Sequence, residues 1–78
     1  MNKEKFLKLV KNKNIPEDAY SLNGGLPDDR YCINEKPIGW EVYYTERGKK
    51  YRIKIFENKE EAFQDLYNRL IKMKKAME

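Results

Sequence analysis

The apolar positions along the chain change their spacing twice, from helical to alternating and back to helical. Residues 3–12 place Phe6, Leu9 and Val10 at positions i, i+3 and i+4 among lysines, which predicts a short amphipathic helix that ends before Pro16. Residues 59–76 repeat the helical spacing over a longer stretch, with Asn58 as the predicted N-cap. The apolar stripe of this second helix would consist of Phe63, Leu66, Leu70, Met73 and Met77.

Residues 19–56, between the two helices, alternate apolar and polar side chains and are interrupted by turn signals, as β-strands are. We expect a short strand at residues 19–22, a turn-rich loop at 23–29, a second strand at 30–34 and a hairpin over 40–56. Arg47 and Gly48 would form the hairpin turn, although arginine suits the positive φ of such a turn poorly. A longer, even-numbered loop is the alternative, and it keeps the same pairing.

The predicted hairpin has one apolar face and one polar face. On the apolar face the cross-strand pairs would be Tyr44 with Tyr51, Val42 with Ile53 and Trp40 with Ile55. On the polar face Glu41 would pair with Lys54, and Tyr43 would lie against Arg52. A slip by one residue would turn the apolar set toward water, so the pattern favours this register.

These elements predict an α+β fold with a short N-terminal helix, a three- or four-stranded antiparallel sheet, and a C-terminal helix packed on one sheet face as a two-layer sandwich. With 78 residues, the chain is expected to form a single domain over residues 1–78. We find neither an apolar run long enough to span a membrane nor a signal peptide, so we expect a cytoplasmic protein with no membrane partner.

The chemistry of the side chains argues against an enzyme. The sequence has no histidine and one cysteine, Cys32, which removes Ser-His and Cys-His pairs, internal disulfides and most zinc sites. Asp28 and Asp29 are adjacent, so they would diverge, and they lack the spaced oxygen ligands of a calcium loop. We therefore expect no catalytic residue, no metal and no cofactor, and we interpret Cys32 as a small buried side chain.

The charge is distributed in blocks. The whole chain has 17 basic and 13 acidic residues and a net charge of +4. Residues 15–48, however, are net acidic, and they lie between two basic segments. An exposed tyrosine among acids is typical of an interface for a basic protein. The candidate interface residues are Leu26, Asp28, Asp29, Glu41, Tyr43 and Glu46. The alternative is that the polar sheet face is only solvated, with Tyr43 packed over Arg52.

Two segments carry a resemblance to a known class of proteins. The run Ser-Leu-Asn-Gly-Gly-Leu-Pro at residues 21–27 and the run Trp-Glu-Val-Tyr-Tyr-x-Glu-Arg-Gly at residues 40–48, with Phe56 and Ala62 beyond them, resemble small immunity proteins of bacterial polymorphic and contact-dependent toxin systems. The resemblance implies a non-enzymatic antitoxin that binds and neutralises the C-terminal domain of a secreted toxin. The positive net charge departs from the acidic character usual in antidotes to basic nucleases, so the acidic middle would have to supply the complementarity.

A second resemblance gives the alternative function. Trp40, the basic strand after Gly48, Phe56 and the start of the last helix are similar to the arm-binding domain of tyrosine recombinases, in which Arg52 and Lys54 would contact DNA. The acids near that surface argue against a nucleic-acid partner. The double-stranded-RNA fold shares the element order, but this chain lacks that family's lysine cluster at the start of the last helix. A homodimer formed through a free sheet edge is a third alternative.

Overall fold

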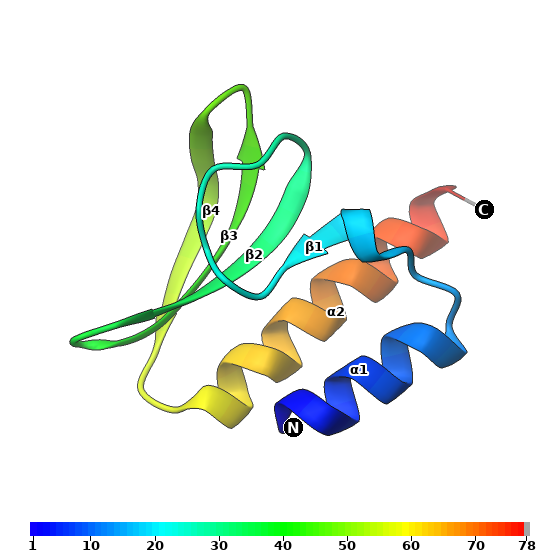
Figure 1. Ribbon diagram of the computed structural model, residues 1–78, viewed down its shortest axis with the longest axis horizontal. Helices are drawn as coiled ribbons and strands as arrows, with labels where there is room; N and C mark the ends of the chain where they lie inside the picture. The colour runs from blue at the N-terminus through cyan, green and yellow to red at the C-terminus, as the bar shows by residue number, and fades with distance from the viewer. Residues whose placement is uncertain (78) are drawn as a thin grey trace.

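The computed structural model describes residues 1–77 as a helix, a four-stranded sheet and a second helix (Figure 1). The elements are α1 (Lys3–Asn12), a 3₁₀ turn η1 (Glu17–Ala19), β1 (Tyr20–Ser21), β2 (Arg30–Lys36), β3 (Gly39–Glu46), β4 (Lys49–Phe56) and α2 (Lys59–Met77). The predicted α+β fold class is confirmed, with α2 packed on the sheet. No helix in this part of the chain is both long and apolar enough to cross a membrane.

An asparagine side chain caps the N-terminus of each helix. The Asn2 side-chain oxygen accepts a hydrogen bond of 2.8 Å from the Lys5 amide, and Asn58 accepts one of 2.8 Å from the Glu61 amide. Each bond satisfies one of the amides that the first turn of a helix leaves without a partner. The prediction of Asn58 as the N-cap of α2 is therefore confirmed.

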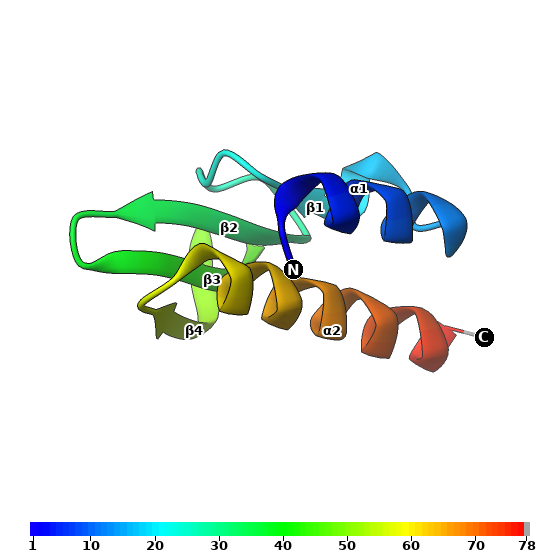
Figure 2. The same cartoon turned by 90° about the horizontal axis from the view of Figure 1, so that it is seen from below.

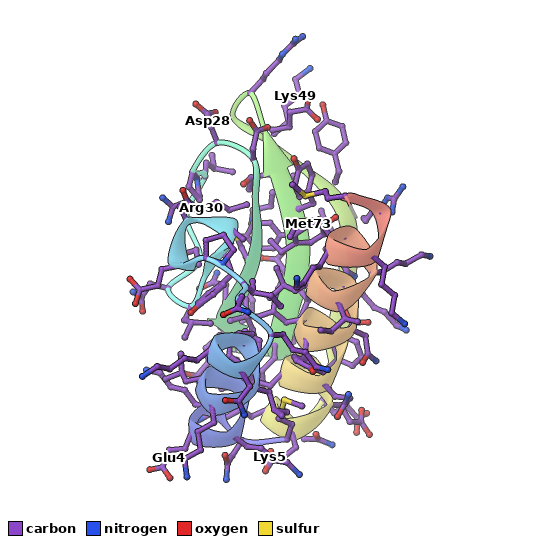
Figure 3. All side chains as sticks on the ribbon, turned by 90° about the vertical axis from the view of Figure 1, so that its right-hand side faces the viewer. Glu4, Lys5, Asp28, Arg30, Lys49 and Met73 are labelled. Atoms are coloured by element: carbon purple, nitrogen blue, oxygen red, sulfur yellow. The ribbon has the colours of Figure 1, made fainter. Side chains whose placement is uncertain are left out.

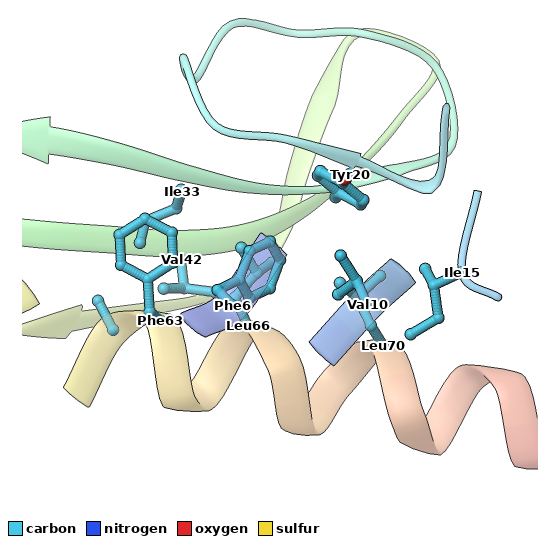
Figure 4. Close-up of a cluster of buried hydrophobic side chains, with 10 residues drawn as sticks. Phe6, Val10, Ile15, Tyr20, Ile33, Val42, Phe63, Leu66 and Leu70 are labelled. Carbon is cyan, nitrogen blue, oxygen red and sulfur yellow. The ribbon is translucent and has the colours of Figure 1, made fainter. Parts of the chain in front are cut away.

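The two helices lie side by side on the same face of the sheet (Figures 2 and 3). Their apolar side chains meet those of the central strands in one core (Figure 4). Buried members of that core include Phe6, Val10, Ile33, Val42, Phe63, Leu66 and Leu70. The C-terminal end of the predicted α2 stripe does not join it, because Met77 lies beyond the sheet and is 79% exposed.

The sheet has the order β1-β2-β3-β4, and its first strand departs from the prediction. β1 runs parallel to β2, pairing Tyr20 with Tyr31 and Ser21 with Cys32, so the sheet is mixed and not wholly antiparallel. A parallel neighbour requires the chain to return to the starting end of the sheet before the next strand begins. Residues 22–29 make that return, and we call this segment the crossover.

The β3–β4 turn has the two residues that the sequence predicts. Arg47 has a φ of 52° and Gly48 a φ of 76°, the pair of positive angles that a tight hairpin turn of this kind needs. Tyr44 pairs with Tyr51 across the turn, as expected. Arg47 therefore adopts the unfavourable positive φ. The alternative of a longer hairpin loop is wrong, because Glu46 pairs with Lys49.

Beyond Tyr44 the predicted register is wrong, because β4 contains a β-bulge. The pairing shifts between Tyr44 and Val42, where Arg52 has a φ of 54°. Val42 therefore faces Lys54, where Ile53 was predicted, and Trp40 faces Phe56 in place of Ile55. An extra residue in one strand exchanges the two faces of everything after it, which alternation along a single strand does not reveal.

The bulge turns the two isoleucines of β4 away from the helices. Ile53 is 52% exposed and Ile55 is 44% exposed, although the sequence pattern assigned both to the core. Lys54 now stands beside Val42 on the helix side of the sheet, with its ammonium 5.2 Å from the centre of the Phe56 ring. Trp40 keeps its predicted side and packs against Phe63.

Substitution of Gly39 should be far more damaging than substitution of Gly48. Both have positive φ, but a Cβ at Gly39 would collide with the Phe56 carbonyl oxygen, whereas a Cβ at Gly48 would meet nothing within 4 Å. Gly48→Ala is expected to lower the free energy of unfolding by roughly 1–2 kcal/mol, from backbone strain alone. Gly39→Ala should exceed that loss by about 2 kcal/mol or more. Urea titration measures both, and equal losses would contradict the close approach of β3 to the end of β4.

Candidate functional site

The six candidate interface residues fall in three places. Leu26, Asp28 and Asp29 lie in the crossover, Glu41 and Tyr43 lie on β3, and Glu46 ends β3 at the hairpin turn. The crossover leads into the start of β2, which pairs with the end of β3. Asp28, Asp29 and Glu46 therefore share one end of the sheet, where Figure 3 also shows Asp28 and Lys49.

Tyr43 points to the sheet face opposite the helices, as predicted, but it is not accessible. Its side chain is fully buried, and its hydroxyl donates a 2.8 Å hydrogen bond to the Gly25 carbonyl oxygen. The crossover follows β2, with the Gly24 amide bonded to the Ile33 carbonyl oxygen, and then meets Tyr43 on the far face of the sheet. The expectation that Tyr43 offers its ring to a partner is therefore wrong.

Glu41 is also buried, and it pairs with a different lysine from the one predicted. Its carboxylate lies 3.0 Å from the ammonium of Lys50, not beside Lys54, because the bulge moves Lys54 to the other face. The same ammonium lies 4.5 Å from the centre of the Tyr43 ring, in the place predicted for Arg52. Glu41, Tyr43 and Lys50 thus form a closed structural cluster.

The surroundings of this cluster keep the side chains of Tyr43 and Cys32 from ionising. Burial, followed by the nearby Cys32 and Glu41, raises the pKa of Tyr43 to about 12. Burial also raises the pKa of the Cys32 thiol, whose sulfur lies 3.9 Å from the Thr45 hydroxyl. Cys32 is fully buried, as expected of a small packing side chain. Both groups stay protonated at neutral pH.

The two crossover aspartates contribute to a groove of about 640 Å³. The groove lies between the crossover, the segment that joins α1 to β1, and the last turns of α2. Its apolar wall includes Ile15, Pro16, Ala19, Met73 and Met77. Its charged rim has the carboxylates of Asp18, Asp28 and Asp29 together with Arg30 and Lys74.

Asp29 is held in place at this rim. One of its carboxylate oxygens accepts a 3.4 Å hydrogen bond from the Tyr44 hydroxyl, and Asp29 itself has a φ of 52°. Burial, followed by the charge of Asp29, raises the pKa of Tyr44. The Tyr44 ring in turn packs against the Tyr31 ring in a tilted arrangement, with 4.7 Å between the ring centres. The rim is thus tied to two adjacent strands of the sheet.

The groove contains residues that the sequence pattern did not single out. Asp18 follows the first helix by several residues, and Met73 was assigned to the core stripe of the second helix. The parallel placement of β1 brings the segment before it against the end of α2. The sequence gives no signal for the parallel pairing of β1. The acidic residues of this segment therefore could not be grouped into Asp18, Asp28 and Asp29 from the sequence alone.

Comparisons with known proteins give no relative: no protein family, curated protein or solved structure matches the chain. Within residues 1–77, no group of three or more His, Cys, Asp or Glu side chains is arranged to hold a metal ion.

Tyr43→Phe should destabilise the fold, because it removes the hydrogen bond that the buried Tyr43 side chain donates to the Gly25 carbonyl oxygen. We expect a loss of about 1–2 kcal/mol in the free energy of unfolding. The pKa of Tyr43 rises from 10.0 to about 12 on folding, so its contribution is complete below pH 10 and is lost as the pH rises toward 12. Urea titrations across this alkaline range should show a shallower decline for the variant. The control is Tyr51→Phe, at an exposed position on β4; equal losses in both variants would contradict the assignment.

Proposed function

We propose that this protein is a non-enzymatic immunity protein that binds a secreted bacterial toxin domain and neutralises it. The groove at the end of the sheet supports this proposal, because it combines an apolar wall with a rim on which three carboxylates outnumber the two cationic side chains, Arg30 and Lys74. Lysine and arginine have apolar stems and cationic heads, so a basic side chain of a partner suits such a groove. The partner would therefore present a basic surface to this end of the molecule.

The proposal also draws on the resemblance of two sequence runs to immunity proteins, and these two runs contact each other in the fold. Gly25 belongs to the run at residues 21–27, and Tyr43 belongs to the run at residues 40–48. The hydrogen bond between them joins these runs across 18 positions of sequence. The hydrogen bond between Gly25 and Tyr43 thus fixes the crossover. Leu26, Asp28 and Asp29 remain at its accessible turn.

Neutralisation would require only tight binding over the toxin's functional surface. Leu26, which is 54% exposed, lies next to the acidic positions of the crossover and would give the interface an apolar contact. Glu46 at the hairpin turn would extend the acidic rim. The buried pair of Glu41 and Tyr43 would support the crossover from below and make no contact with the toxin.

The first test is protection in cells. Candidate toxin domains, taken from any secreted-toxin gene that neighbours this one, are expressed with and without the full chain, and survival and co-purification are measured. We expect survival and a complex of one copy of each protein. Toxin domains that kill equally well in the presence of the protein would contradict the proposal.

The second test locates the interface. Asp28→Asn with Asp29→Asn removes two negative charges from the groove and should weaken the complex roughly tenfold or more. Glu35→Gln with Glu57→Gln removes two exposed charges from the opposite end of the sheet, and this control should change affinity by less than about threefold. Calorimetric titration measures both pairs, and an unchanged affinity for the aspartate pair would remove the groove from the interface.

A further inference from the structure

We infer that the outer edge of β4 binds an extended protein segment in which acidic and β-branched residues alternate, adding it to the sheet as a fifth strand. This inference concerns a different surface from the groove and does not depend on the proposed function. Three features carry it: an edge strand with one neighbour, a basic concavity on one side of that strand, and two exposed isoleucines on the other.

The outer edge of β4 is open. β4 is the last strand in the sheet order, and within residues 1–77 it pairs only with β3. None of its eight residues is buried. The bulge at Arg52 interrupts this edge, so the regular part that can pair with an added strand is residues 53–56, and the lysines of β4 disfavour any added strand that is not acidic.

The basic concavity lies between α2 and the helix-facing side of the sheet, where β2 and β4 each contribute one residue. It measures about 370 Å³ and is lined by Arg52, Arg69 and Lys72 together with Tyr31, Met73 and Ala76. The left-handed φ of Arg52 places this side chain at the bulge next to α2, a conformation that costs a non-glycine residue some strain. Among residues 1–77, no carboxylate lines the concavity.

Arg69 is held in an ion pair at this place. Its Nε lies 2.8 Å from a carboxylate oxygen of Asp65, one turn earlier on α2. Its Nη1 is buried and has no hydrogen-bond partner within the described part of the chain. Asp65 Oδ2, the other member of this ion pair, is buried as well, so the pair belongs to the packing of α2, and the cationic groups that a partner's carboxylate would meet are those of Arg52 and Lys72.

The opposite side of the same edge is apolar. Ile53 and Ile55 point to the face away from the helices and are about half exposed. Successive residues of an added strand would point to opposite faces of the sheet. Its apolar residues would thus lie beside Ile53 and Ile55, and its acidic residues beside Arg52, Lys54 and Lys72.

Charge and apolarity together select this occupant over two others. A second copy paired through β4 would set Arg52 and Lys54 near the same basic residues of its partner, which is repulsive. Nucleic acid would satisfy the basic side chains, but its phosphates would leave Ile53 and Ile55 uncovered. An acidic, apolar segment matches both sides of the strand.

The test uses a short capped peptide of alternating glutamate and valine, titrated into the isotope-labelled full chain. We expect amide chemical-shift changes confined to β4 and the neighbouring part of α2, with slower hydrogen exchange at residues 53–56. The same peptide with lysine in place of glutamate should bind at least about tenfold more weakly. Equal binding of the two peptides, or shifts centred on the groove, would overturn the inference.

Matched variants separate charge at the site from overall charge. Lys72→Glu should weaken peptide binding roughly fivefold, whereas Lys8→Glu, an equal change at an exposed position of α1, should leave it within about twofold. Arg52→Asn removes the charge while tolerating the positive φ, and should also weaken binding. Two results would refute the proposed occupant: duplex DNA bound more tightly than the peptide, with a steep salt dependence, or a dimer formed through β4 in sedimentation.

Discussion

The β-bulge at Arg52 decides which side chains of β4 meet the helices and which meet solvent. In an unbroken ladder Ile53 and Ile55 would enter the core, and Lys54 would pair with Glu41. The observed shift sends Phe56 inward and both isoleucines outward, and it leaves Lys50 to neutralise the buried Glu41. A single residue with positive φ therefore sets the composition of the core, of the far sheet face and of the open edge.

The crossover is the second determinant of the surface. Because β1 is parallel to β2, residues 22–29 return past the edge of β2 and meet Tyr43. This contact removes Tyr43 and Glu41 from the accessible surface and places Asp28 and Asp29 on a groove with Asp18 and Met73. The acidic middle of the sequence thus divides into a buried structural part, on β3, and an exposed part that lines the groove. The basic concavity beside β4 adjoins the groove at Met73, which lines both, but its other lining residues include no carboxylate among residues 1–77.

Local patterns predicted the elements well, and long-range geometry explains the errors. The helical spacing of Phe6 and Val10, the cap at Asn58 and the turn at Arg47 and Gly48 are encoded by neighbours in sequence, and the structure has all of them. The bulge has no such signal, since Arg52 is not one of the residues that favour positive φ. The parallel pairing of Tyr20 with Tyr31 depends on a crossover whose course no periodicity records. The burial of Tyr43 and the grouping of Asp18 with Asp28 follow from that course, which is why the candidate site was only partly predicted.

The register of β3 against β4 is the most direct test of this account. Cross-strand nuclear Overhauser contacts in solution distinguish the two possible ladders. The account predicts contacts of Val42 with Lys54 and of Trp40 with Phe56, and solvent-exposed side chains at Ile53 and Ile55. Contacts of Val42 with Ile53 and of Trp40 with Ile55 would mean that the bulge is absent, and the binding edge inferred for β4 would be lost with it.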